Sequence, residues 1–151
     1  MELADLMNMN VLAVSPETTL ADAAHQMMDH DTGAACVLED GKLVGVISER
    51  DLLRVISEGY DPALSVGERM KRHVLTASPS TSLPEAMAIM VDGHFRHLPV
   101  VDAGRVIGMI SMRDLMAWAA LRLRQSGTAD DDVIDTAELV ATINRMRTGA
   151  S

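Results

Sequence analysis

The sequence has few aromatic residues and a single cysteine, and both shortages narrow the classes of protein that it can encode. One Trp, one Tyr and one Phe occur among 151 residues, whereas Met occurs twelve times. Methionine is a flexible side chain that fills irregular interiors, so we expect a core packed with Met instead of rings. The lone thiol of Cys36 excludes an internal disulfide and a cysteine zinc cluster, and its apolar neighbours predict that it is buried.

Long apolar runs and an excess of positive charge are also absent. The longest apolar run covers residues 115–121, whereas a helix that crosses a bilayer needs about 20 residues. No N-terminal apolar segment of the signal-peptide kind is found. A formal net charge of -9 at pH 7 argues against general affinity for nucleic acid or anionic membranes. We therefore expect a soluble cytoplasmic protein with no nucleic-acid partner and no membrane partner.

An internal repeat organises most of the chain. Residues 3–58 align with residues 66–121 without a gap when the sequence is shifted by 63 positions. We therefore predict a first repeat with its linker over residues 1–65, a second repeat over 66–122, and a tail over 123–151. The tail holds an acidic linker and an amphipathic helix over residues 136–147. The identical pairs include Ser15/Ser78, Pro16/Pro79, Leu20/Leu83, Gly41/Gly104, Gly45/Gly108, Ser48/Ser111, Arg50/Arg113 and Asp51/Asp114.

Each copy predicts the element order β-α-β-β-α. A short strand ends at Ser-Pro, a helix with a capping box follows, two apolar stretches form a hairpin around a glycine turn, and a last helix begins after a serine. In the first and second copy, respectively, these features are strands 11–14 and 74–77, caps Thr19 and Ser82, turn residues Gly41 and Gly104, and serines Ser48 and Ser111. The predicted class is α/β (α+β), and the two small units could pack sheet to sheet or side by side.

The Ser-x-x-Asp sequence that closes each hairpin has two interpretations. As a cap, the Ser hydroxyl accepts from the backbone N–H of the Asp, whose charge suits the positive end of the helix dipole. As a binding site, the strand-to-helix junction favours anions, and the carboxylate can accept two hydrogen bonds from a ribose diol. The neighbouring Arg50 and Arg113 could reach phosphate oxygens or simply lie along their own helices. Capping and binding are compatible, so both interpretations stay open.

The duplicated unit resembles the cystathionine β-synthase (CBS) domain, and the pair resembles a Bateman module. The resemblance rests on TLADAAHQM and GKLVGVISERDLL in the first copy and on SLPEAMAIM and FRHLPVVDAGRVIGMISMRDLM in the second. It implies two pseudo-symmetric units that meet through their sheets, with two clefts at the interface for adenosine-containing ligands such as AMP, ADP, ATP or S-adenosylmethionine. It also implies that Asp51 and Asp114 bind the ribose hydroxyls, with Ser48 and Ser111 beside them.

The resemblance assigns further ligand contacts unequally to the two copies. It implies basic, phosphate-contacting residues just before the Leu-Pro-Val strand, where the second copy has Arg96 and His97 and the first has Gly33 and Ala34. It also implies a contact to the base or ribose by Thr76. We therefore expect the second copy to be the better equipped, although each cleft can borrow residues from both copies.

These observations favour a sensory or regulatory module over an enzyme. The expected regulatory ligand is an adenine nucleotide (AMP, ADP or ATP), with S-adenosylmethionine or NAD as alternatives, and no cofactor is required. The signal would pass in trans, to a second copy in a homodimer or to an effector protein. A ligand-free structural or interaction module, with Ser-x-x-Asp as caps only, is the second hypothesis. An enzyme is the least supported, because no activated nucleophile is evident and His94 and His97 have no further ligand to complete a metal set.

Overall fold

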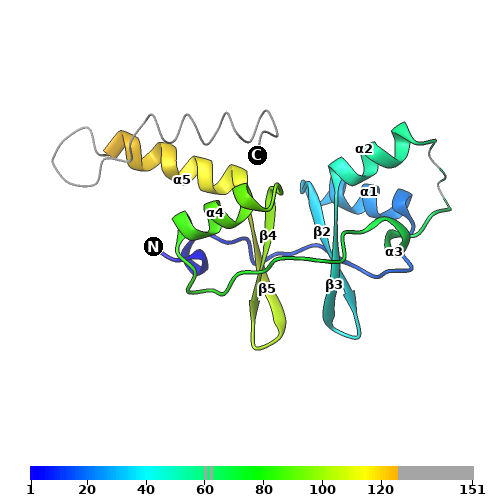
Figure 1. Ribbon diagram of the computed structural model, residues 1–151, viewed down its shortest axis with the longest axis horizontal. Coiled ribbons are helices and arrows are strands. Elements are labelled where there is room, and N and C mark those ends of the chain that lie inside the picture. The colour runs from blue at the N-terminus through cyan, green and yellow to red at the C-terminus, as the bar shows by residue number, and fades with distance from the viewer. Residues whose placement is uncertain (60, 62, 126–151) are drawn as a thin grey trace.

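The computed structural model describes residues 1–59, 61 and 63–125, and its elements follow the order of the repeat (Figure 1). The predicted α/β (α+β) class is confirmed, whereas the acidic linker and the predicted helix over residues 136–147 lie outside the described residues. The first unit contains β1 (Ala13–Val14), α1 (Leu20–Asp29), β2 (Ala34–Glu39), β3 (Lys42–Ser48) and α2 (Glu49–Ser57). The second contains α4 (Leu83–Asp92), β4 (His97–Asp102), β5 (Arg105–Ser111) and α5 (Met112–Gln125). Two short helices, η1 (Leu3–Asp5) and α3 (Val66–Arg69), precede the units.

Hydroxyl caps start α1 and α4 where the sequence predicts. The Thr19 hydroxyl accepts from the Asp22 N–H at 3.1 Å, and the Ser82 hydroxyl accepts from the Glu85 N–H at 3.3 Å. Each such cap stabilises its helix by about 1 kcal/mol. Both helices bury Leu, Ala and Met side chains at helical spacing against their own sheet, namely Leu20, Ala23 and Met27 in α1 and Leu83, Ala86 and Met90 in α4.

Both predicted hairpins form, and each turns through two residues in the left-handed region. The φ angles are 50° and 75° at Asp40 and Gly41, and 46° and 77° at Ala103 and Gly104. Positive φ at both central positions matches the right-handed twist of the flanking strands. The turns therefore set the antiparallel pairing of β2 with β3 and of β4 with β5.

The predicted first strand forms in the first copy only. There β1 pairs in parallel with β2, and the Cys36 N–H donates to the Leu12 carbonyl at 2.9 Å. The residue that corresponds to Cys36 in the second copy is Pro99, which has no N–H to donate. The prediction of a strand over residues 74–77 is therefore wrong, and what remains is a single parallel bridge at Ala77.

The segment before each unit packs on the other unit. We call residues 3–10 and 66–73 the lead-ins. Leu3 is fully buried in the core of the second unit, and Val66 is fully buried in the core of the first. The bridges Asn8↔Met109 and Val46↔Lys71 continue these contacts along β5 and β3. Neither core is therefore complete without chain from the other repeat.

The two sheets meet across a small apolar cluster, as the resemblance implied. Ala34 and Cys36 of β2 are buried there against Met109 of β5. Figure 1 shows the two sheets side by side at the centre, with the helices on the outside. Cys36 is fully buried, as predicted, and burial raises the pKa of its thiol to about 12.

Candidate functional site

Asp51 lies in the first turn of α2 and is only 4% exposed. Its Oδ2 accepts from the backbone N–H of Ser48 at 2.9 Å and from the Ser48 hydroxyl at 2.8 Å. The Ser48 Oγ in turn accepts from the Asp51 N–H at 3.4 Å. The second carboxylate oxygen, Oδ1, lies 3.8 Å from Nη1 of Arg54. The cap therefore uses one carboxylate oxygen and leaves the other able to accept further hydrogen bonds.

Asp114 repeats this arrangement at the start of α5. Its Oδ2 accepts from the backbone N–H of Ser111 at 2.9 Å and from the Ser111 hydroxyl at 2.5 Å, and the Asp114 N–H donates to Ser111 Oγ at 3.2 Å. The capping interpretation is thus confirmed in both copies. It does not consume the carboxylates, because both caps use Oδ2.

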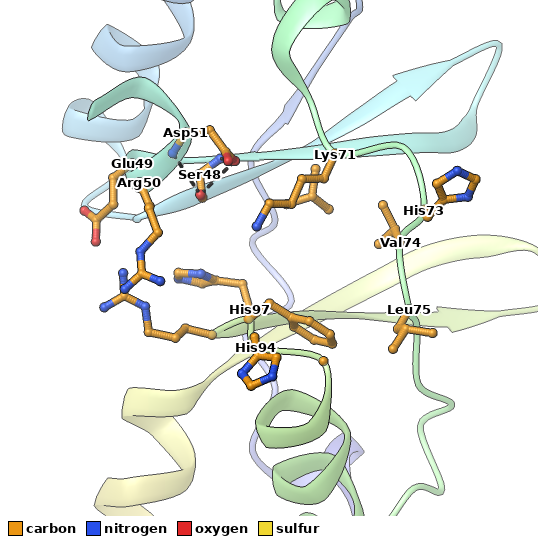
Figure 2. Close-up of a pocket in the computed structure, with 14 residues that line it drawn as sticks. Ser48, Glu49, Arg50, Asp51, Lys71, His73, Val74, Leu75, His94 and His97 are labelled. Carbon is orange, nitrogen blue, oxygen red and sulfur yellow. Dashed lines mark hydrogen bonds between the residues drawn. The ribbon is translucent and has the colours of Figure 1, made fainter. Parts of the chain in front are cut away.

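Asp51 borders a cleft between the two units, which we call the Asp51 cleft (Figure 2). Figure 2 shows Asp51 at the start of α2 on one side, His94 and His97 on the other, and Lys71 extending into the space between them. The cleft holds about 870 Å³ of space, part of it open to solvent. Its lining residues are Val46, Ser48, Glu49, Arg50, Asp51, Lys71, His73, Val74, Leu75, Gly93, His94, Phe95, Arg96 and His97.

Asp114 borders a second cleft, which we call the Asp114 cleft. It holds about 1370 Å³ of space, again partly open to solvent. Lining residues from the first unit and its lead-in are Asn8, Asn10, Val11, Leu12, Met27, Met28, Asp31, Thr32, Gly33, Ala34 and Glu49. Those from the second unit are Arg96, His97, Met109, Ser111, Met112, Arg113, Asp114 and Met116. Each cleft is therefore made by both copies.

The predicted site residues fall into three groups. Ser48, Arg50 and Asp51 line the Asp51 cleft, and Ser111, Arg113 and Asp114 line the Asp114 cleft. Arg96 and His97 border both clefts. Thr76 is exposed and lines neither, whereas Val74 and Leu75, which precede it, line the Asp51 cleft.

The basic residues of the second copy face the acid of the first. Arg96 and His97 lie across the Asp51 cleft, and the positions that face Asp114 in the same way are Gly33 and Ala34. The expectation that the second copy is the better equipped stays a prediction. Arg96 and His97 border both clefts, which agrees with the expectation that each cleft can borrow residues from both copies. Sequence reasoning missed Lys71, since only the crossing of the lead-in brings this residue to the cleft.

His97 lies where the two clefts meet, and its environment opposes protonation. Burial lowers its pKa most, and the neighbouring Arg96 guanidinium lowers it further. The carboxylates of Glu49 and Asp114 act in the opposite direction, and Arg113 lowers the pKa of His97 by a smaller amount. His97 is therefore a neutral hydrogen-bonding group near pH 7, and the permanent positive charge beside it comes from Arg96.

No group of three or more His, Cys, Asp or Glu residues in the described part of the chain is arranged to hold a metal ion. None of the helices among residues 1–59, 61 and 63–125 combines the length and apolar character required to cross a membrane.

Comparison with known proteins identifies the CBS domain, which the repeat resembles, in both copies. The family model of the CBS domain matches residues 3–58 and 66–121. The CBS domain-containing protein YhcV of Bacillus subtilis is 36% identical over 112 residues, which are 74% of this chain and 80% of YhcV. The crystal structure of the CBS-domain protein ATU1752 from Agrobacterium tumefaciens is 30% identical with a TM-score of 0.75, over 79% of this chain and 99% of that one.

A third relative was solved with a ligand. The crystal structure of CBSX2 in complex with AMP is 31% identical to this chain with a TM-score of 0.68, over 82% of this chain and 98% of CBSX2. The two family matches coincide with the two halves of the internal repeat. The chain therefore belongs to the CBS domain family, as a tandem pair of these domains.

Proposed function

We propose that the chain is a cytoplasmic regulatory module that binds an adenosine-containing ligand, preferably AMP, ADP or ATP, and signals its occupancy in trans. The observation that carries the proposal is the pair of aspartates whose caps use only Oδ2 at the border of each cleft, so that Oδ1 can accept further hydrogen bonds, in Asp51 beside its ion pair with Arg54. A carboxylate in this state suits the vicinal hydroxyls of a ribose. The AMP complex of CBSX2, at 31% identity, supports the same class of ligand.

The rest of the Asp51 cleft supplies complementary chemistry for a nucleotide. Leu75 is 54% exposed although it is apolar, so a purine that covers it would remove apolar surface from water. The carbonyl of Leu75 lacks the hydrogen bond that Leu12 receives from Cys36, because Pro99 has no N–H, and it can accept from an adenine amino group. Phosphate oxygens would meet Lys71 and the guanidinium groups at the end of the cleft.

Signalling follows from the way the clefts are shared. A ligand in the Asp51 cleft contacts the first copy through its ribose and the second copy through its phosphates, so it favours one arrangement of the two units over others. A homodimer is part of the proposal, because Leu53 and Ile56 of α2 are 66% and 59% exposed and offer an apolar face to a second copy. An effector protein could read the same change of arrangement.

A ligand-free interaction module is the second candidate, and the capping geometry favours it. Both Ser-x-x-Asp sequences are satisfied as caps without any ligand. On this hypothesis the clefts serve no small molecule, and the exposed apolar face of α2 is the functional surface.

Thermal unfolding with AMP, ADP, ATP, NAD and S-adenosylmethionine separates the two candidates. A ligand at a hundred times its dissociation constant should add about 2.7 kcal/mol to the free energy of unfolding. The substitutions Asp51→Asn and Asp114→Asn should remove that gain at their own clefts. Asp22→Asn is the matched control, because Asp22 has the same place in the first turn of α1 but is exposed and lines neither cleft. The absence of a shift with all five compounds would favour the interaction module.

A further inference from the structure

The two clefts are built from corresponding residues, so their charges can be compared position by position. The backbone is equivalent at the two strand-to-helix junctions. The Glu49 N–H donates to the Gly33 carbonyl at 2.9 Å, and the Met112 N–H donates to the Arg96 carbonyl at 2.8 Å. The offset of the repeat therefore identifies the counterpart of each side chain in the other cleft.

The basic residues of the Asp51 cleft have neutral or acidic counterparts in the Asp114 cleft. Among the basic residues that line the Asp51 cleft, Arg50 alone keeps its charge in its counterpart, Arg113. The other pairs, with the Asp51 cleft first, are Lys71/Asn8, His73/Asn10, His94/Asp31, Arg96/Gly33 and His97/Ala34.

Glu49 places an acid in the Asp114 cleft where the Asp51 cleft has a base. A Cβ atom built on Gly33 would lie 3.1 Å from Cδ and 3.2 Å from Oε1 of Glu49. Gly33 is the counterpart of Arg96, so the Glu49 carboxylate occupies the space where an arginine side chain would begin. The counterpart of Glu49 itself is the uncharged Met112.

The balance of charge consequently differs between the clefts. The Asp51 cleft is lined by three cations, Arg50, Lys71 and Arg96, and by two acidic residues, Glu49 and Asp51. The Asp114 cleft is lined by two cations, Arg96 and Arg113, and by three acidic residues, Asp31, Glu49 and Asp114.

We infer that the two clefts select different classes of adenosine ligand and that Glu49 sets the difference. The Asp51 cleft takes an adenosine that carries phosphate, because its cations exceed its anions. The Asp114 cleft takes an adenosine without phosphate, because a phosphate there would lie against the Glu49 carboxylate in place of a guanidinium. The inference rests on the proposed function and assigns a ligand class to each cleft.

Isothermal titration with AMP and with uncharged 5′-methylthioadenosine tests the assignment. AMP should bind the wild-type chain at one site, and Asp51→Asn should remove that binding while Asp114→Asn leaves it intact. Asp114→Asn should bind the uncharged nucleoside at one site fewer than the wild-type chain does. Lys71→Asn, which installs the counterpart residue at an exposed position, is an independent variant should Asp51→Asn not fold. It should weaken AMP binding at least tenfold without changing the affinity of the uncharged nucleoside.

The specificity role of Glu49 needs its own variant. Glu49→Gln keeps the size of the side chain and removes the charge, so AMP should gain a second site and bind the Asp114 cleft at least tenfold more tightly than before. Glu39→Gln, at the exposed end of β2 and outside both clefts, is the matched control and should bind AMP at one site. Two AMP sites in the wild type, or one in Glu49→Gln, would overturn the inference and leave the proposed function standing. A wild-type chain that binds neither probe would overturn the proposed function itself.

Discussion

A capping aspartate and a proposed ligand-binding aspartate share the same local sequence, and they differ in burial. Thr19-x-x-Asp22 and Ser48-x-x-Asp51 both place an acid three residues after a helix cap. Asp22 is exposed on the outside of the first unit, whereas Asp51 is 4% exposed and borders a cleft. The sequence could therefore predict four helix starts from this pattern. It could not show which of the four acidic residues border a cleft, because that depends on the tertiary fold.

His97 predicts a dependence of stability on pH. Its pKa in the folded state is lowered, chiefly by burial and then by Arg96, and so lies below the unfolded value of about 6.5. Between these two pKa values the unfolded chain binds more protons, so the free energy of unfolding falls as pH decreases below about 6.5. We expect His97→Gln to make this decrease shallower, as measured by urea unfolding at a series of pH values. His25→Gln, on the exposed face of α1, should keep the wild-type slope. Equal slopes in the wild type and His97→Gln would contradict the prediction.

At the scale of elements, helices and hairpins could be predicted because their determinants are local. Hydroxyl caps and the paired residues with positive φ specify α1, α4 and both turns within a few residues of chain. The strand over residues 74–77 failed because a proline on the neighbouring strand withholds a hydrogen bond. The packing of each lead-in on the other unit could not be predicted, because an apolar residue such as Leu3 can be buried equally well in either core.

The glycines that face the lead-ins, Gly45 and Gly108, should differ in how much stability an alanine costs. A Cβ on Gly45 would lie 2.8 Å from the backbone oxygen of Lys71, and one on Gly108 would lie 3.3 Å from that of Asn8. Both would also meet a methionine side chain, which can move. Gly45→Ala must therefore displace backbone, and we expect it to cost about 1–3 kcal/mol of unfolding free energy, more than Gly108→Ala. Urea unfolding of the two variants measures the difference. A larger loss for Gly108→Ala would contradict the prediction and show that the lead-in over residues 66–73 moves easily.

Gly45→Ala should also affect binding, because the displaced backbone carries Lys71. The bridge between Val46 and Lys71 holds this residue at the Asp51 cleft. On the proposed function, Gly45→Ala should weaken AMP binding, whereas Gly108→Ala should leave it unchanged.

At the scale of the whole molecule, the candidate site is a product of the pairing of the units. The Ser-x-x-Asp sequences and the basic pair Arg96 and His97 could be selected from the sequence by resemblance. The sequence could not show that Arg96 lies across a cleft from Asp51, because these two residues come from different copies and face each other only across the interface. The inferred difference in ligand class between the clefts follows from this exchange, because a substitution in one copy changes the cleft that contains the aspartate of the other copy.

The same exchange predicts that the two units unfold together. Val66 is fully buried in the first core, and we expect Val66→Ala to cost about 2 kcal/mol by loss of buried apolar volume. Trp118, the one tryptophan of the chain, packs against the core of the second unit and reports on that unit. Because Val66 belongs to the second repeat and stabilises the first unit, its loss should shift the Trp118 fluorescence transition in urea as far as it shifts the circular dichroism transition.

Met9→Ala is the control for this coupling, because Met9 lies in the other lead-in but is 75% exposed. It should move neither transition. If Val66→Ala shifts the circular dichroism signal while Trp118 keeps its wild-type midpoint, the units unfold independently and the crossed lead-ins do not couple them. A ligand that bound only one cleft would then leave the other unit unaffected. Coincident transitions would mean that occupancy of either cleft stabilises the whole pair, which is the property that a module needs if it is to report a bound ligand to a partner.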